Sequence, residues 1–415
     1  MAGMGLNVRR HMRILIADKL DESAKLTLEE IGHEVQDNPN LGPNDLPRSI
    51  QGVEVLVVRS TNVTSETLLA ADRLTLVVRA GAGVDTIDVD AASEFGVHVC
   101  NVPGKNAAAV AEITFALLLA LDRHIVDGAT DLRQGHWKKQ QYSIADGVMG
   151  KTIGIIGLGD VGLSVAERAK AFGLRVVGQR KTDRSPNIEQ RIRQIGIRLT
   201  DSLEELVAQS DIVSLHVPYN EETTGMIDTD LLERFKEGAI LINTSRGEII
   251  DEVALIQAME SKGVRAGLDV FCDEPNSGEK TITSEIASHP SVVGSHHIGA
   301  STKQASKAIA DGVVEAILSF ESGSPLHCVN EAPPGEGTSQ VRVRHLDRVG
   351  VLASVLATLR AAELNVQRMD NRIFKGKKAA VASIEVDGPV PMGIYEELMA
   401  INYVLGVSLL DKRTV

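Results

Sequence analysis

The sequence predicts two doubly wound α/β domains followed by a small βαββαβ domain. Three observations lead to this fold class. Short β-branched runs alternate with helical stretches in two series between residues 13 and 322, the pattern of parallel sheets that helices cover on both faces. The 415 residues exceed what one hydrophobic core accommodates. A Pro/Gly-rich stretch at residues 331–338 then separates a final segment with its own pattern and indicates a linker.

The first series predicts a parallel sheet near the N-terminus. Residues 23–31 have helical periodicity, and Gly32 suits the C-terminal cap of that helix. An Ala- and Leu-rich stretch at 104–124 predicts a long buried helix. The apolar runs that predict buried strands are residues 13–18, 53–58 and 74–79.

A second series of alternating strands and helices follows, and the C-terminal segment then has a different order of elements. Helices are expected at 161–172, 253–262 and 303–322, between and after a second set of strands at residues 152–156, 174–177, 211–217, 239–243, 265–270 and 291–295. The last segment predicts strands at 341–344, 365–374, 379–386 and 404–410, with helices at 349–361 and 393–400. That order is βαββαβ, as in ferredoxin-like domains.

Composition excludes several classes of function. The net charge of −13 argues against a surface made for nucleic acid or anionic membranes. Cys100, Cys272 and Cys328 are scattered without a CxxC pair, so we expect neither a disulfide framework nor a zinc site, and a reducing cytoplasm fits. No apolar run reaches the ~18 residues of a transmembrane helix. Residues 1–12 lack the apolar segment of a secretory signal and suggest a tag remnant or an early start codon.

The strongest local motif is Gly157-Leu158-Gly159-Asp160-Val161-Gly162, which follows the strand predicted at 152–156 and opens a helix. In that context the first glycine permits a tight turn, and the second lets the backbone approach a pyrophosphate. The third lets helix and strand pack closely. The helix N-terminus favours the negative charge of the ligand. The motif predicts a dinucleotide site, and NAD is the expected cofactor.

The residue that would bind the adenosine ribose is unusual. A carboxylate is expected about 20 residues after the glycine loop, but Arg180 stands near that position, followed by Lys181. An arginine there can accept the 2′-phosphate of NADP. Alternatively, Arg180 belongs to a solvated basic turn that leaves NAD use intact, and the sequence does not decide between the two.

Three further residues suit alcohol oxidation by hydride transfer. Arg246 follows the strand predicted at 239–243, where a guanidinium at the carboxyl edge of the sheet can bind a carboxylate. His297, after the strand at 291–295, can take the hydroxyl proton, and Glu274 can orient it. Taken singly, a histidine or a glutamate is more often structural than catalytic, and the arginine could equally form a surface ion pair.

Together these motifs resemble the D-isomer-specific 2-hydroxy acid dehydrogenases over about residues 13–330. The resemblance implies that Arg246 binds the substrate carboxylate and carbonyl, that Glu274 partners the catalytic His297, and that Asp269 contacts the nicotinamide amide. His296 stands where the family commonly has proline. Residues 104–297 would form the dinucleotide-binding Rossmann domain, and residues 1–103 with 298–330 a discontinuous, flavodoxin-like substrate domain.

The same resemblance implies further contacts. The cofactor would also meet Pro218 and Thr244. The residues expected at the substrate, with a phosphate near Arg59, are Arg59, Ser60, Ala82, Gly83, Asn106 and Lys139. Lys139 belongs to a Trp-Lys-Lys segment that the family places near a subunit interface, although a surface turn is as good an interpretation.

The segment from 339 to 415 resembles an ACT domain, a regulatory amino-acid-binding module. The implied effector contacts are His345, Asp347 and Asn365, and serine is the implied effector. Asp347 stands where asparagine is usual, which weakens the case for serine, and a domain that only dimerises is the alternative. Among these dehydrogenases an ACT domain marks those that oxidise D-3-phosphoglycerate in serine biosynthesis, so the resemblance implies that substrate and a homo-oligomer, dimer or tetramer.

Two other functions stay open. A glyoxylate or hydroxypyruvate reductase of the same class would suit Arg180 if the cofactor were NADPH. A dinucleotide-sensing corepressor or scaffold could retain the Arg, Glu and His set without turnover, although the acidic net charge and the C-terminal segment count against it.

Overall fold

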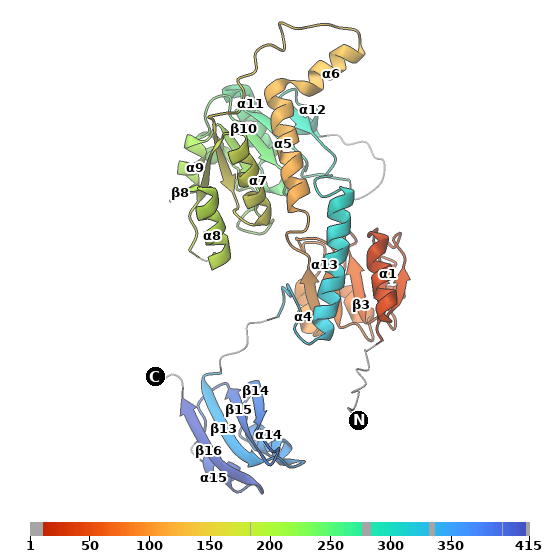
Figure 1. Ribbon diagram of the computed structural model, residues 1–415, viewed down its shortest axis with the longest axis vertical. Helices are drawn as coiled ribbons and strands as arrows, with labels where there is room; N and C mark the ends of the chain where they lie inside the picture. The colour runs from red at the N-terminus through yellow and green to blue at the C-terminus, as the bar shows by residue number, and fades with distance from the viewer. Residues whose placement is uncertain (1–10, 183, 276–283, 332–336, 392, 412–415) are drawn as a thin grey trace. The chain divides into compact units, whose positions relative to one another are not determined.

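The computed structural model describes residues 11–182, 184–275, 284–331, 337–391 and 393–411, and the basic residues before 11 lie outside this part (Figure 1). The chain divides into two compact units, Met1–Asn330 and Glu331–Val415. The larger unit contains two parallel sheets and the smaller unit one antiparallel sheet, so the predicted fold class is confirmed. Most of the predicted linker, 332–336, lies outside the described residues. None of the described helices is long and apolar enough to span a bilayer.

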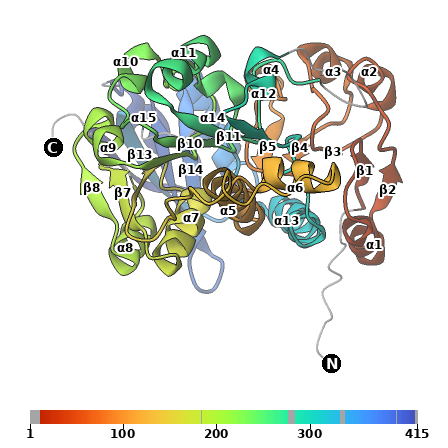
Figure 2. The same cartoon turned by 90° about the horizontal axis from the view of Figure 1, so that it is seen from above.

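The first sheet has five parallel strands in the order β2-β1-β3-β4-β5. Its strands are β1 (Arg13–Ile16), β2 (Glu34–Asp37), β3 (Val55–Val58), β4 (Leu76–Arg79) and β5 (His98–Asn101). One face carries α1 (Glu22–Ile31) and α13 (Lys303–Glu321), and the other carries α2 (Leu46–Ser49), α3 (Ser65–Ala70) and α4 (Val89–Glu94) (Figure 2). Helix α1 ends as predicted, because Gly32 adopts a left-handed φ of 112° and its N–H bonds back to the last turn.

The second sheet has seven parallel strands in the order β12-β11-β10-β9-β6-β7-β8. Its strands are β6 (Thr152–Ile156), β7 (Arg175–Gln179), β8 (Arg198–Thr200), β9 (Ile212–Leu215), β10 (Ile240–Asn243), β11 (Arg265–Leu268) and β12 (Val292–Gly294). One face packs against α5 (Ala107–Arg123), α7 (Asp160–Ala171) and α8 (Pro186–Ile195), and the other against α9 (Leu203–Gln209), α10 (Thr229–Leu232), α11 (Glu252–Lys262) and α12 (Glu285–Ser288). Helix α6 (Ile125–Arg133) extends from α5.

The strand orders fix where ligands can bind. In both parallel sheets the order reverses, between β1 and β3 in the first and between β6 and β9 in the second. Ligands of such sheets bind outside the carboxyl ends of the strands at these reversal points. The sheets lie within the predicted discontinuous substrate domain and the predicted dinucleotide domain, whose exact limits stay predictions.

The smaller unit is a four-stranded antiparallel sheet in the order β14-β15-β13-β16, backed by two helices. Its elements are β13 (Ser339–Leu346), α14 (Val351–Ala361), β14 (Val366–Ile373), β15 (Ala379–Val386), α15 (Ile394–Met399) and β16 (Val404–Asp411). Alternate residues of β13 and β15 are buried, the period-2 pattern of a sheet with one face on the core, and β13 is longer than the strand predicted at 341–344. The βαββαβ order is therefore as predicted.

Candidate active site

The glycine loop between β6 and α7 has the geometry of a pyrophosphate site. Gly157 has a φ of +96°, and a Cβ there would lie 2.2 Å from the carbonyl oxygen of His216. A Cβ on Gly162 would lie 1.9 Å from the carbonyl oxygen of Gly157, so helix and loop pack too closely for any side chain. A Cβ on Gly159 would meet only open space. The loop therefore leaves room for a ligand where the backbone N–H groups at the start of α7 can reach it.

A pocket of about 730 Å³ lies beside this loop. It is lined by residues from both parallel-sheet regions, among them Ala82, Gly83, Asn106, Val161, Pro218 and Thr244. Leu158 is buried and Asp160 pairs with Arg191 at 3.5 Å, so these two predicted cofactor contacts offer backbone groups rather than side chains. His216 also lines the pocket, which sequence reasoning missed, and burial lowers its pKa to about 3.

Arg180 lies just after β7 and is largely exposed. Its Nε donates a hydrogen bond of 3.1 Å to Oδ1 of the exposed Asp201. Lys181 is exposed beside it, and Arg184 follows on the same connection. The carboxyl end of β7 is thus basic, with one carboxylate already engaged by Arg180.

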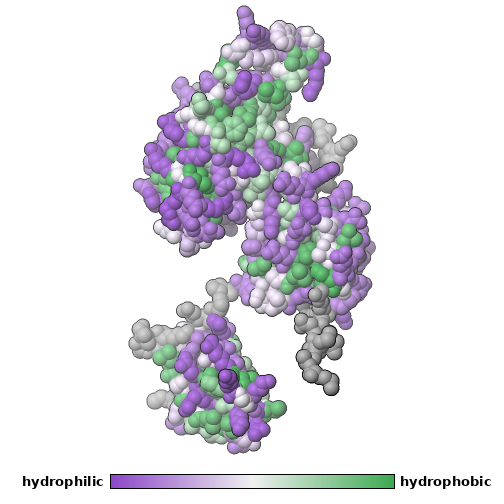
Figure 3. All heavy atoms as spheres, viewed as in Figure 1, coloured by the Kyte–Doolittle hydropathy of each residue, from purple (hydrophilic) through white to green (hydrophobic). Residues whose placement is uncertain are grey.

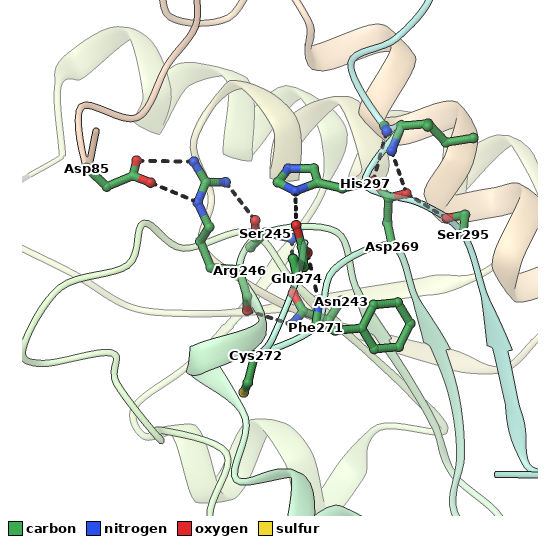
Figure 4. A network of polar contacts seen from close by, with 12 residues as sticks. Asp85, Asn243, Ser245, Arg246, Asp269, Phe271, Cys272, Glu274, Ser295 and His297 are labelled. Carbon is green, nitrogen blue, oxygen red and sulfur yellow. Dashed lines mark hydrogen bonds and ion pairs between the residues drawn. The ribbon is translucent and has the colours of Figure 1, made fainter. Parts of the chain in front are cut away.

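His297 and Glu274 form a hydrogen-bonded pair (Figure 4). Nδ1 of His297 lies 2.6 Å from Oε2 of Glu274, while Oε1 accepts a hydrogen bond of 2.9 Å from the N–H of Phe271. Burial raises the pKa of Glu274, but the bonds from His297 and Phe271 lower it more, so the pKa lies below its ordinary value. The carboxylate is therefore ionised at neutral pH and fixes the imidazole, leaving Nε2 for a substrate proton.

Asp269 holds the loop that carries His297. The buried carboxylate accepts hydrogen bonds from the Ser295 hydroxyl at 2.6 Å and from the N–H groups of Ile298 and Gly299 at 2.9 and 2.8 Å (Figure 4). Its own carbonyl accepts from the N–H of His297, which adopts a left-handed φ of 52°. The structure thus shows Asp269 positioning the histidine loop, and the predicted nicotinamide contact stays a prediction.

Arg246 follows β10 on a turn that Asn243 stabilises. The buried Asn243 side chain accepts from the N–H of Ser245 at 3.0 Å and donates to the carbonyl of Arg246 at 2.8 Å. Nε and Nη2 of Arg246 donate to the two carboxylate oxygens of Asp85 at 3.3 and 3.2 Å. Burial raises the pKa of Asp85, but the charge and hydrogen bond of Arg246 lower it by more, so the pKa lies below its ordinary value and Asp85 is ionised. Sequence reasoning did not identify this ion pair.

Arg246 shares a second pocket, of about 420 Å³, with two more arginines, Arg59 and Arg79. Burial first, and then repulsion from Arg246 and Arg59, lower the pKa of Arg79 to about 10, while Asp85 acts in the opposite direction. Within the described residues, Nε of Arg79 is buried without a hydrogen-bond partner. The pocket also contains His297 and the carboxylates of Glu274, Asp85 and Asp269, so the acid–base pair and three arginines line one cavity.

Asp18, at the end of β1, fixes the loop that carries Arg59. Its carboxylate accepts from the backbone N–H groups of Arg59, Ser60 and Thr61 at 2.7 to 3.0 Å, and from the Ser60 hydroxyl at 2.9 Å. This loop lies at the reversal point between β1 and β3. Arg79, the last residue of β4, and Asp18, just after β1, were not predicted as site residues, and their position at the carboxyl ends of parallel strands was the signal that could have identified them.

The structure brings most predicted substrate residues to the pocket but not Lys139. Ser60, Ala82, Gly83 and Asn106 line it with Arg59. Lys139 follows α6 and is exposed, and it lines a separate pocket with Trp137. The physical reason is that α6 and the segment after it extend away from the sheet (Figure 1). Within one chain, Lys139 is therefore not a residue of the Arg246 and His297 pocket.

The three predicted effector contacts do not meet within the smaller unit. His345 is buried near the end of β13, where its ring nitrogens contact the carbonyl of Leu346 and the Asn371 side chain. Asp347 follows at the same end. Asn365 immediately precedes β14. The first residue of β14, Val366, pairs with Val386 at the end of β15, and Val386 in turn pairs with Ser339 at the beginning of β13. Asn365 therefore lies at the opposite end of an eight-residue strand, roughly 20 Å away.

Comparison with known proteins identifies the family. The D-isomer specific 2-hydroxyacid dehydrogenase NAD-binding domain matches residues 115–299. A hydroxypyruvate reductase of Thermotoga maritima is 38% identical over 309 residues, covering 74% of this chain and 97% of that protein. The chain belongs to the D-isomer-specific 2-hydroxyacid dehydrogenase family. The Arg246, Glu274 and His297 arrangement is therefore the site to consider for the chemistry of that family.

Several relatives of this chain are named D-3-phosphoglycerate dehydrogenase. The protein of Mycobacterium bovis named D-3-phosphoglycerate dehydrogenase is 38% identical over 361 residues and covers 85% of this chain, more than the larger unit alone contains. This chain spans 57 to 66% of the length of three such relatives. The solved structure of an NAD⁺-bound 3-phosphoglycerate dehydrogenase from Entamoeba histolytica matches with a TM-score of 0.64 and 26% identity, covering 78% of this chain and all of that one.

No group of three or more His, Cys, Asp and Glu side chains within the described residues is arranged to hold a metal ion.

Proposed function

We propose that this chain oxidises D-3-phosphoglycerate to 3-phosphohydroxypyruvate, the first step of serine biosynthesis. The observation that carries the proposal is the 420 Å³ pocket that combines the His297–Glu274 pair with three arginines. A phosphorylated hydroxy acid has two anionic groups, and a pocket with Arg246 at one anion and Arg59 and Arg79 at another suits both. The buried, partly unpartnered Arg79 would gain a charge-assisted hydrogen bond from a phosphate.

Each residue has a distinct task in the reaction. Arg246 binds the carboxylate and polarises the adjacent C2 oxygen, and Nε2 of His297 accepts the C2 hydroxyl proton. Glu274 stabilises the imidazolium that forms, because its carboxylate lies 2.6 Å from Nδ1. A nicotinamide dinucleotide bound at the Gly157–Gly162 loop would take the hydride from C2. In the reverse direction, His297 returns the proton.

Glu274→Gln tests the pair through its pH dependence. The substitution keeps a hydrogen-bonding group but removes the charge that stabilises the imidazolium. We expect kcat to fall by roughly 10- to 100-fold. We also expect the acidic limb of the kcat/KM profile to move to lower pH, because the base then stays unprotonated in more acidic solution. A lower kcat with an unmoved acidic limb would show that Glu274 has only a structural role.

The choice between NAD and NADP depends on Arg180. We propose that its guanidinium, with Lys181 and Arg184 nearby, can accept the 2′-phosphate of NADP. Arg180→Asp should then shift the NAD to NADP preference in kcat/KM by at least ~10-fold toward NAD, because repulsion replaces attraction. Lys181→Ala is the matched control for loss of one exposed charge. An unchanged ratio in Arg180→Asp would show that Arg180 lies outside the cofactor site.

Initial rates test the proposal as a whole. The full chain is assayed with D-3-phosphoglycerate and either NAD or NADP, with and without serine, and then with hydroxypyruvate or glyoxylate and the reduced cofactors. Turnover of phosphoglycerate supports the proposal. Reduction of hydroxypyruvate or glyoxylate without phosphoglycerate turnover would assign the chain to the reductases. That outcome would agree with its similarity to the hydroxypyruvate reductase of Thermotoga maritima. Dinucleotide binding without any turnover would favour a sensing protein.

Self-association is part of the proposal. Apolar side chains are exposed on and after α6, among them Ile125, Leu132, Trp137, Ile144 and Met149, and Figure 3 shows hydrophobic surface over α5 and α6 near the top of the view. An effector that touches His345, Asp347 and Asn365 would have to lie between two copies of the smaller unit. A homo-oligomer with serine at such an interface, in the cytoplasm, is the arrangement that we propose.

A further inference from the structure

Two cysteines lie directly opposite each other at the edge of the first sheet. Cys100 in the edge strand β5 pairs with Cys328 in an isolated antiparallel bridge. The N–H of Asn101 donates to the carbonyl of His327 at 3.2 Å, and the N–H of Val329 donates to the carbonyl of Val99 at 2.8 Å. These bonds flank the pair, so the two cysteines occupy a non-hydrogen-bonded position, where Cα atoms are about 4.5 Å apart.

Both side chains lie on the same face of the sheet. Cys100 is fully buried in the core that α1 and α13 form with this sheet, and Cys328 packs against that same cluster. A disulfide requires Cα atoms roughly 4.4 to 6.8 Å apart and Cβ atoms that converge. The bridge places the pair at the short end of that Cα range, with the two side chains opposite each other on one face of the sheet.

The two thiols differ in access. Both cysteines are in the thiol form in the structure. Cys328 is half-buried, and its Sγ donates to Oδ1 of Asn330 at 3.4 Å, whereas Cys100 is fully covered. An oxidant from solution would therefore reach Cys328 first, with Cys100 placed to resolve the product. Redox-sensing cysteines have this combination of an accessible sulfur and a resolving thiol nearby.

We propose that Cys100 and Cys328 form a reversible disulfide when the protein meets a peroxide. The Cys328 thiolate attacks the peroxide, which gives a sulfenic acid and hydroxide as the O–O bond breaks. The Cys100 thiol then displaces the sulfenic oxygen as water, and the S–S bond forms. Overall, two thiols and hydrogen peroxide give one disulfide and two molecules of water, so two sulfurs are oxidised and the peroxide is reduced. A dithiol reductant then restores both thiols by thiol–disulfide exchange and is itself oxidised to a disulfide.

The cross-link would fasten the end of the larger unit to the sheet. Asn330 is the last residue of that unit, and its side chain already accepts from the N–H of Val99 at 2.8 Å and donates to the carbonyl of Val97 at 2.9 Å. A covalent bond two residues earlier would fix the point from which the chain leaves toward the smaller unit. The same strand ends at Asn101, whose amide donates to the carbonyl of Ala82 beside the substrate pocket.

Thiol mapping tests the proposal on the full chain. The reduced protein is treated with hydrogen peroxide, the excess peroxide is removed, and the chain is then unfolded in guanidinium chloride containing N-ethylmaleimide, so that buried thiols also react, before digestion and mass spectrometry. Of the three cysteines, we expect only Cys272 to be alkylated, together with a Cys100–Cys328 peptide pair that is lighter by two hydrogen atoms. If dithiothreitol is added after the peroxide and removed before N-ethylmaleimide, all three cysteines should be alkylated.

Cys272 provides the internal control. Burial, followed by the charge and hydrogen bond of Glu252, raises the pKa of Cys272 to about 12, so it stays a protonated thiol at neutral pH. Cys272→Ser should form the cross-link as the natural sequence does, while Cys100→Ser and Cys328→Ser should each abolish it. A cross-link that includes Cys272, a cross-link between two chains, or Cys328 sulfinic acid beside alkylated Cys100 would overturn the proposal. These readouts do not depend on catalytic activity.

Discussion

Replacing His297 by alanine is expected to lower kcat by at least ~100-fold while dinucleotide affinity changes little. The imidazole is held by Glu274 through Nδ1, so Nε2 is the nitrogen left to take the hydroxyl proton. His297 lines the pocket with Arg246 but is not among the residues of the pocket beside the glycine loop. Loss of the base should therefore affect the chemical step rather than cofactor binding. Steady-state kinetics with D-3-phosphoglycerate, combined with calorimetric titration of the dinucleotide, measure the two effects separately.

The doubled histidine supplies the matched control. His296 is exposed and immediately precedes His297. His296→Ala should retain kcat to within about threefold, as exposed substitutions usually do. The opposite result, with near-normal turnover in His297→Ala and a large loss in His296→Ala, would transfer the role of the base to His296. Equal losses would indicate that either change disturbs the loop that Asp269 holds.

The central strands could be predicted because they are buried on both faces. Strands β3, β6, β9 and β10 are fully buried runs of apolar or small residues, and such runs are visible in a sequence. Edge strands give weaker signals: β2 is Glu-Val-Gln-Asp and largely exposed, and β8 has three residues. Neither was predicted, because a strand with one partner and a solvated face does not require apolar residues.

The proposed catalytic residues could be placed at a sheet edge because their motifs are local. Arg246 and His297 follow strands of one parallel sheet, so their carboxyl-end position can be inferred from strand prediction alone. The Asp85–Arg246 ion pair could not be inferred, because it joins segments 161 positions apart that belong to different sheets. The role of Asp269 depends likewise on a loop that begins 26 positions later.

The smaller unit shows the same limit in another form. Its βαββαβ order could be predicted from the succession of strand-like and helical stretches, but the distance between His345 and Asn365 depends on strand register. A resemblance to a family motif indicates which residues contact an effector, but it does not say whether one chain or two chains supply them. Only the strand register shows that these residues lie at opposite ends of the domain.

Replacing Arg246 by glutamine should reduce kcat/KM for D-3-phosphoglycerate by roughly 1,000-fold, with most of the change in KM. A charged, bidentate contact to a carboxylate contributes about 3 kcal/mol, and loss of carbonyl polarisation adds to this. Arg246→Lys should recover only part of the loss, because one ammonium cannot reproduce the planar pair of N–H donors. Initial-rate measurements over a wide range of substrate concentration separate KM from kcat.

Asp85→Asn distinguishes binding from a structural role for Arg246. Both Arg246→Gln and Asp85→Asn remove the same ion pair, whose two hydrogen bonds are 3.2 and 3.3 Å long. If Arg246 served only to pair with Asp85, the two variants would lose the same kcat/KM. If Arg246 binds the substrate carboxylate, Asp85→Asn removes a competing carboxylate while the guanidinium stays, so we expect kcat/KM to change by less than about tenfold. Equal losses in the two variants would therefore contradict the substrate-binding role, because the substrate needs the guanidinium and not the ion pair.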